Sequence, residues 1–206
     1  MKAPILVTGF RPFAGHPANP SGLVARALAG RSFFGHRVRA AVLPVVYADI
    51  ESAIDRLLAE VKPSAVVSLG LDYKTDVLKL ERIAINLDDA SIPDEAGDHR
   101  SGRRIAARGP AARWSTLPLD SIAAALAAAG VPFKFSSYAG AFLCNHLMYH
   151  LCGRAARAGI PAGFIHLPPT PDLIRADDNA TRSGVPVESQ VSAIRAVVRA
   201  VAGSLG

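Results

Sequence analysis

Cysteine, aromatic residues and long apolar runs are all scarce in this sequence. Its 206 residues include two cysteines and 6% aromatic residues. Two cysteines cannot build a disulfide framework or a cysteine-rich zinc site, so a reducing cytoplasm is the expected location. No apolar run approaches the ~20 residues of a membrane-spanning helix, and the stretch Ile5–Val7 after Lys2 is too short for a signal peptide. We therefore expect no membrane association.

The excess of positive charge is modest, and the cations are dispersed along the chain. A formal net charge of +6 would suit an acidic partner only if the cations gathered on one surface. The densest group of arginines lies in a stretch with Gly and Pro and without interleaved aromatics: Arg100, Arg103, Arg104, Arg108 and Arg113. We interpret this stretch as a solvated loop and expect no nucleic-acid partner.

Short apolar runs rich in Val and Ile alternate with segments of helical period. Strands are expected at Pro4–Gly9, Val38–Leu43, Ala65–Gly70, Phe133–Ser137 and Gly163–Leu167. Helices are expected at Ser21–Ala29, Ile50–Val61, Leu119–Ala129, Cys144–Ala158 and Val187–Val201. The 50% hydrophobic content suffices for one core. The alternation predicts a single domain over residues 1–206, a three-layer α/β/α sandwich with a mostly parallel central sheet.

The middle of the chain departs from this alternation. Val77–Asn86 has the pattern of one extended segment, and Leu87–Ser115 is punctuated by Gly and Pro. A loop of that length suggests a functional excursion beside a site. The loop also holds four acids that we expect to be solvated: Asp88, Asp89, Asp94 and Glu95.

Cys144 lies where a strand turns into a helix, within the first turn of the expected helix. Unpaired backbone amides and the positive end of the helix dipole favour thiolate over thiol there, which makes Cys144 a candidate nucleophile. Most free cysteines are small buried hydrophobes, however, and position alone leaves both interpretations open. Cys152 lies two turns further along among Leu151 and Ala155, and we interpret it as structural.

A thiolate hydrolase needs a base, and His166 is the best placed histidine. His146 and His150 are nearer in sequence, but they lie about 200° and 240° around the helix from Cys144 and point away from it. His166 ends an apolar strand, at the sheet edge where Cys144 is expected to emerge. Without a nucleophile in view, such a histidine would more often be structural.

Glu81 is the candidate acid that would orient the histidine. It lies inside the apolar run Val77–Asn86, where a carboxylate needs a partner. Adjacent strand residues face opposite ways, so Arg82 is excluded as that partner and Lys79 is not. An ion pair with Lys79 therefore remains the alternative to a catalytic role.

The first expected strand runs into a Gly- and Pro-rich loop that carries Phe10, Phe13 and Asn19. Its glycines fit neither G-x-G-x-x-G nor G-x-x-x-x-G-K-[ST], so nucleotide binding is not expected. Two phenylalanines with one placed amide are typical instead of a small-molecule pocket.

Four segments together carry a family resemblance: Thr8–Phe13 with Asn19–Ser21, Glu81–Asn86, Ala139–His146 and Phe164–Pro168. In order and spacing they resemble the motifs of pyroglutamyl peptidase I, also called pyrrolidone-carboxylate peptidase, over almost the whole chain. The resemblance implies a cysteine peptidase that hydrolyses the amide bond after an N-terminal pyroglutamyl residue. It implies Cys144 as nucleophile, His166 as base and Glu81 as the orienting acid.

The resemblance also implies the surroundings of the reaction. Peptides with an N-terminal pyroglutamate would be the partners, with no metal and no cofactor, in a cytoplasmic protein that is frequently a homotetramer. Phe10, Phe13 and Phe142 would sandwich the lactam ring, Asn19 would bond to it, and Leu71 would offer backbone groups.

The chain departs from the family pattern in several places, among them Tyr138, Ala141 and Ser91. Members commonly carry Gly-Gln-Ala-Gly-Gly-Arg where this chain has Gly70–Thr75, and Ser or Thr where Lys79 stands. Leu71 cannot supply the side-chain amide. Two alternatives therefore stay open: a divergent amidase for another small acyl or lactam group, and a non-catalytic binding protein that uses its basic surface.

Overall fold

The computed structural model describes residues 2–175 and 183–206, and a seven-stranded sheet forms its centre. In spatial order the strands are β2 (Ser32–Phe33), β3 (His36–Leu43), β1 (Lys2–Phe10), β4 (Ala65–Leu71), β9 (Ala162–Leu167), β5 (Leu78–Glu81) and β8 (Phe133–Ser136). The central strands β3, β1, β4 and β9 are parallel. β2 is antiparallel to β3, β5 is antiparallel to β9, and β8 is parallel to β5. The prediction of a mostly parallel sheet is confirmed at its centre.

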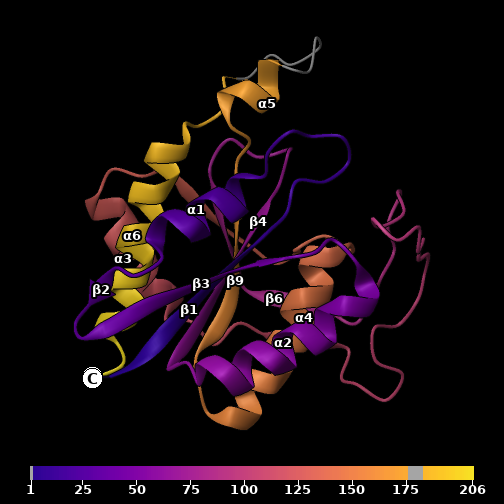
Figure 1. Ribbon diagram of the computed structural model, residues 1–206, viewed down its shortest axis with the longest axis horizontal. Helices are drawn as coiled ribbons and strands as arrows, with labels where there is room; N and C mark the ends of the chain where they lie inside the picture. The colour runs from indigo at the N-terminus through magenta and orange to yellow at the C-terminus, as the bar shows by residue number, and fades with distance from the viewer. Residues whose placement is uncertain (1, 176–182) are drawn as a thin grey trace.

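Helices cover both faces of the sheet, as Figure 1 shows. One layer holds α1 (Pro20–Leu28), α3 (Leu119–Ala128) and α6 (Val187–Gly203), and the other holds α2 (Tyr47–Val61) and α4 (Leu143–Ala158). The short α5 (Pro171–Arg175) and the edge strand β2 were not expected, because two to five residues carry no readable period. No helix of the described part of the chain has the length and apolarity needed to cross a membrane.

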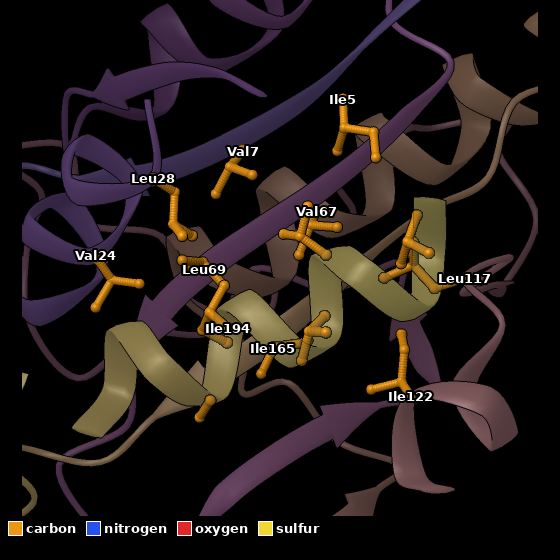
Figure 2. Close-up of a cluster of buried hydrophobic side chains, with 14 of the residues drawn as sticks. Ile5, Val7, Val24, Leu28, Val67, Leu69, Leu117, Ile122, Ile165 and Ile194 are labelled. Carbon is orange, nitrogen blue, oxygen red and sulfur yellow. The ribbon is translucent and has the colours of Figure 1, made fainter. Parts of the chain in front are cut away.

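The two faces of the sheet have separate hydrophobic cores. Figure 2 shows one of them, in which Ile5, Val67 and Ile165 of the sheet meet Ile194 of α6. The other core packs the opposite faces of the strands, including Val66 and Phe164, against α2 and α4. Successive strand residues alternate between the two cores, as the period of two requires.

The prediction of one extended segment over Val77–Asn86 was wrong. The chain breaks at Arg82, after which β6 (Ile83–Ile85) leaves the main sheet and pairs with β7 (Ala112–Trp114). Arg82 lies at the break, with its guanidinium 4.1 Å from the centre of the Phe135 ring and its amide bonded to Ser136 O. Continuous apolar patterning could not reveal that two sheets share the run.

The loop after β6 is more structured than expected. Asp88 and Asp94, predicted to be solvated, are buried. Asp94 accepts a hydrogen bond of 2.8 Å from the backbone amide of Tyr47, the first residue of α2, which has no acceptor within the helix. Asp88 bonds Arg100 at 2.9 Å, which removes that arginine from the solvated cluster. Spatial neighbours rather than local composition decided the burial of these charges.

Arg113 is the other arginine of the expected solvated cluster that is packed instead. Its guanidinium lies 4.1 Å from the centre of the Tyr149 ring and donates to Tyr149 O at 2.8 Å. The remaining members are exposed as predicted: Arg103, Arg104 and Arg108.

Candidate active site

The carboxyl ends of three parallel strands converge on one edge of the sheet. β1 ends at Phe10, β4 at Leu71 and β9 at Leu167, directly after His166. This is the edge at which open α/β sheets assemble ligand sites. The amino end of α4 faces the same edge, which brings Cys144 to it.

Cys144 is the second residue of α4, with Phe142 as the cap position. The cap side chain makes no hydrogen bond, and the bond from His146 N to Phe142 O opens the helical ladder at 3.1 Å. The amides that precede His146 in the first turn therefore have no acceptor within the helix. The site has donors and a positive dipole end beside the sulfur, as the sequence predicted.

Gly70 provides the space in which the sulfur lies. It is paired in register with His166 across β4 and β9, so both positions face the same side of the sheet. A Cβ atom on Gly70 would lie 2.8 Å from Cys144 Sγ and 2.6 Å from the Phe164 ring. The missing side chain thus seats the sulfur over β4, next to the imidazole on the neighbouring strand.

His166 and Glu81 meet through the antiparallel pairing of β5 with β9. Glu81 pairs with Phe164, which places it diagonal to His166 on the same face. His166 Nδ1 lies 2.8 Å from Glu81 Oε1, and both side chains are buried. Because the carboxylate only accepts, Nδ1 donates and Nε2 is left for the sulfur.

The surroundings of His166 favour its protonated form. Burial lowers the pKa of the imidazole. The charge of Cys144 and a hydrogen bond with it, followed by a hydrogen bond with Glu81 and its charge, outweigh burial and raise the pKa to about 9. A histidine between a cysteine sulfur and a carboxylate, with its pKa raised, is the arrangement that an activated cysteine requires.

Lys79 extends this array by one more charge pair. Its ammonium lies 3.4 Å from Glu81 Oε1 and 3.0 Å from Asp72 Oδ2. The sequence left Glu81 with two possible partners, His166 or Lys79, and the structure brings it to both. Burial raises the pKa of Asp72, but hydrogen bonds from Lys74 and Lys79 outweigh it and the net shift is downward. Asp72 was not recognised as part of the site from the sequence.

A cavity of about 260 Å³ opens beside the sulfur. Its walls include every substrate-binding candidate named from the sequence: Phe10, Phe13, Asn19, Leu71 and Phe142. The rings of Phe13 and Phe142 lie 5.4 Å apart and tilted by 32°. A second groove, of about 580 Å³, runs from the sulfur past His166 toward Tyr138 and Lys74.

The Asn19 amide has local partners in addition to its place on the cavity wall. Its Oδ1 accepts from Ser21 N at 3.1 Å and from Ser21 Oγ at 2.7 Å, and its Nδ2 donates to Arg11 O at 3.1 Å. The first of these bonds caps α1. Asn19 thus holds the loop that carries Phe13 onto the start of α1.

The other candidate groups lie away from the sulfur, as helical geometry predicted. His146 bonds Asp88 and His150 packs against it, with ring centres 4.7 Å apart. Cys152 is buried, and burial raises the pKa of its thiol to about 12. Burial thus disfavours the thiolate of Cys152 at neutral pH.

Asn145 holds the irregular chain next to the site and was missed in the sequence. Its amide donates to Ile85 O and Leu87 O and accepts from Ile85 N, each at 2.9 Å. These bonds tie β6 to the first turn of α4. The only sign of this role in the sequence is that Asn145 is a polar residue beside Cys144, on a helix face that is otherwise apolar.

Comparisons with known proteins agree with the motifs. A family model described as pyroglutamyl peptidase matches residues 3–204. Pyrrolidone-carboxylate peptidase 1 of Ralstonia nicotianae is 43% identical over 169 residues, covering 81% of this chain and 79% of the relative. The pyrrolidone-carboxylate peptidase of Cupriavidus pinatubonensis is 39% identical over 197 residues, covering 94% and 90%.

Solved structures show the same likeness. A mutant pyrrolidone carboxyl peptidase from Pyrococcus furiosus superimposes with a TM-score of 0.93 at 32% identity, covering 98% of this chain and 99% of that one. Pyroglutamyl peptidase I of Bacillus amyloliquefaciens gives 0.92 at 29% identity, covering 98% of each chain.

Proposed function

Because the chain belongs to the pyroglutamyl peptidase family, a family of cysteine-type omega peptidases, we propose that its own Cys144, His166 and Glu81 hydrolyse the amide bond after an N-terminal pyroglutamyl residue. The observation that carries this proposal is that the three side chains meet on the same face of the central sheet. Glu81 bonds His166, and the sulfur of Cys144 lies over Gly70, directly across the strand pair from that imidazole.

The reaction follows from the protonation state of the pair. His166 holds the proton of Cys144, and the thiolate attacks the carbonyl carbon of the pyroglutamyl residue. The imidazolium then passes its proton to the leaving amine as the carbon–nitrogen bond breaks. Water, deprotonated by His166, hydrolyses the thioester and frees pyroglutamate and the thiolate. Glu81 keeps Nε2 directed at the sulfur throughout.

Negative charge develops on the carbonyl oxygen during attack, and the first turn of α4 is placed to receive it. The amides of that turn precede the opening bond of the helix at His146. Removal of one such donor in other hydrolases costs about 10²–10³-fold in kcat. No side chain is required for this role.

The cavity beside the sulfur suits a neutral lactam ring. Phe10, Phe13 and Phe142 supply apolar walls, and no charged amine has to be accommodated. A free N-terminal amine would have to shed its water against these rings, which disfavours ordinary peptides. The groove past His166 would take the residues after the pyroglutamyl group.

The decisive experiment compares Cys144→Ala with Cys152→Ala on a fluorogenic pyroglutamyl amide. The first variant should lose at least about 10⁴-fold in kcat with an unchanged circular dichroism spectrum. The second removes the buried thiol and should keep its activity. Substantial turnover by Cys144→Ala would contradict the mechanism. A preference for prolyl or alanyl amides over the pyroglutamyl amide would favour the amidase alternative.

The family resemblance also supports a cytoplasmic homotetramer. Sedimentation velocity on the purified chain tests the assembly, and a monomer at micromolar concentration would contradict it. Fractionation of cells that express the chain tests the location.

A further inference from the structure

Three potential metal ligands meet between α2 and α4, on the side of α4 away from the sulfur. Glu51, His146 and His150 each offer a ligand atom, and these atoms lie within 4.8 Å of one another. The two histidines are one helical turn apart and share a face of α4. Both are buried, whereas Glu51 is exposed on α2.

Two nitrogen atoms in this cluster are buried without a hydrogen-bond partner. They are Nε2 of His146 and Nε2 of His150. The second lies 3.3 Å from Glu51 Oε1, within ion-pair distance. Buried polar atoms are nearly always satisfied, and two orphaned imidazole nitrogens beside a carboxylate call for an occupant.

Asp88 prepares one of these nitrogens for coordination. Its carboxylate oxygens lie 3.0 and 3.1 Å from His146 Nδ1. A carboxylate accepts only, so Nδ1 carries the proton and the lone pair lies on Nε2. Arg100 in turn holds Asp88 at 2.9 Å. A carboxylate behind a histidine is the usual support of a metal-bound imidazole.

We propose that Glu51, His146 and His150 form a binding site for a divalent transition-metal ion of the zinc type, separate from the catalytic centre. Two imidazoles and one carboxylate match the donor preference of Zn²⁺. Tetrahedral coordination requires ligand atoms about 3.3–3.5 Å apart, so the three side chains close slightly around the ion. Water completes the coordination from the exposed side of Glu51.

Arg154 contacts two of the three proposed ligands. Its guanidinium lies 3.0 Å from His150 Nδ1 and 3.1 Å from Glu51 Oε2. Because arginine only donates, His150 Nδ1 accepts, and the proton of the neutral ring lies on Nε2, which is 3.3 Å from Glu51 Oε1 without a hydrogen bond to it. Binding of the ion moves that proton to Nδ1 and turns the Arg154 guanidinium away from His150. Arg154 keeps its hydrogen bond of 3.0 Å to Asp55. The ion and Arg154 therefore compete for the same two side chains.

Occupancy would tie α2 to the helix that carries the nucleophile. His146 lies two residues after Cys144, and its ring packs 5.1 Å from the centre of the Tyr47 ring. Tyr47 in turn contacts Phe142, with ring centres 5.6 Å apart. The ion would thus brace the first turn of α4 without contacting the substrate cavity.

Isothermal titration with Zn²⁺ tests the site in the full chain carrying Cys144→Ala, which removes binding by the active-site thiolate. One ion per chain is expected. Glu51→Gln and His150→Gln should each weaken binding at least about tenfold, and Asp88→Asn should weaken it about 10–100-fold. His99→Gln, which removes an exposed loop histidine, is the matched control and should bind as its parent does.

Arg154→Met separates coordination from a merely structural cluster. Removing the competing guanidinium should tighten Zn²⁺ binding, whereas a structural role predicts no such gain. Visible absorption of bound Co²⁺ should report the same order of affinities. Equal affinities in Glu51→Gln, His150→Gln and His99→Gln, or no binding at all, would overturn the proposal. Glu51 is exposed, so its variant stays informative if a histidine variant fails to fold.

Discussion

At the scale of single residues, His166 links the charge state of the site to stability. Its pKa is raised from 6.5 to about 9 in the folded chain, since Cys144 and Glu81 outweigh burial. A group with a raised folded-state pKa stabilises the fold fully below its unfolded pKa, and this stability is lost as pH rises through the folded pKa. The relevant window is therefore pH 6.5 to 9.

We expect the free energy of unfolding to fall across that window in the parent chain. His166→Gln removes the titrating group, so its urea stability should change less between the two pH values than that of the parent. Urea denaturation at several pH values checks this. A parent chain with the same pH dependence as the variant would show that the imidazole carries no such linkage.

Lys79 is expected to set the basic limb of the activity profile. Its ammonium lies 3.4 Å from Glu81, and a cation there disfavours the imidazolium of His166. Lys79→Met should therefore move the basic limb of kcat/KM to higher pH, and it should lower kcat several-fold because Glu81 loses an anchor.

The matched control for this prediction is Lys74→Met. This variant removes a cation from the same groove. Lys74 bonds Asp72 through its backbone amide, whereas Lys79 reaches Glu81 with its ammonium. The pH profile of kcat/KM is the measurement. Identical profiles for the two variants would count against a positioning role of Lys79.

At the scale of elements, the close approach of α4 to β4 depends on a glycine. A methyl group at Gly70 would meet the sulfur at 2.8 Å and the Phe164 ring at 2.6 Å. Gly70→Ala should displace the first turn of α4, with about 1–3 kcal/mol of lost stability and at least about 100-fold lower kcat.

The same substitution at Gly203 is the control, because a Cβ there lies 3.6 Å from the nearest ring atom and within a helix. Gly203→Ala should leave activity unchanged and raise stability slightly. Steady-state kinetics and thermal melts distinguish the two. Full activity in Gly70→Ala would show that the sulfur does not need this space.

The elements themselves could be predicted where local patterning decides them. Apolar strands such as Ala65–Leu71 and the periodic helix Val187–Gly203 are readable because burial follows their period. The break at Arg82 could not be predicted, because strand partners are chosen by tertiary contacts. The positions of Cys144 at a helix start and of His166 at a strand end could also be predicted, because the apolar period marks where each element begins and ends.

The pairing of side chains around the site could be predicted only in part. Sequence spacing offered Lys79 to Glu81, but Asp72 joins them through a loop whose path no local rule fixes. Asp88 and Arg100 were expected in solvent, since a loop rich in Gly and Pro gives no sign of burial. The register of β5 on β9 had to be known before Glu81 could be placed beside His166.

At the scale of the whole molecule, both cores stabilise the fold, but only one of them packs against the helix that carries Cys144. Ile194 of α6 lies in the core behind the sheet, and Leu147 of α4 lies in the core beneath Cys144. Truncation of either to Ala should cost about 2–5 kcal/mol in the free energy of unfolding. Only Leu147→Ala should also lower kcat/KM, because it loosens α4 one turn after Cys144.

Denaturant titrations and kinetics well below the melting temperature check this difference. Equal losses of kcat/KM in both variants would mean that the sheet transmits packing defects across its full thickness. An unchanged kcat/KM in Leu147→Ala would mean that the first turn of α4 is held by its polar contacts alone.

The burial of Cys152 affects how an oxidised Cys144 can be reduced again. The two cysteines are eight residues apart in one helix, about 12 Å along its axis, so Cys152 cannot act as a resolving thiol. A sulfenic acid formed on Cys144 would have to be rescued by a small thiol from solution, or it would proceed to irreversible forms. The durability of the protein in a cell therefore follows the supply of external reductant.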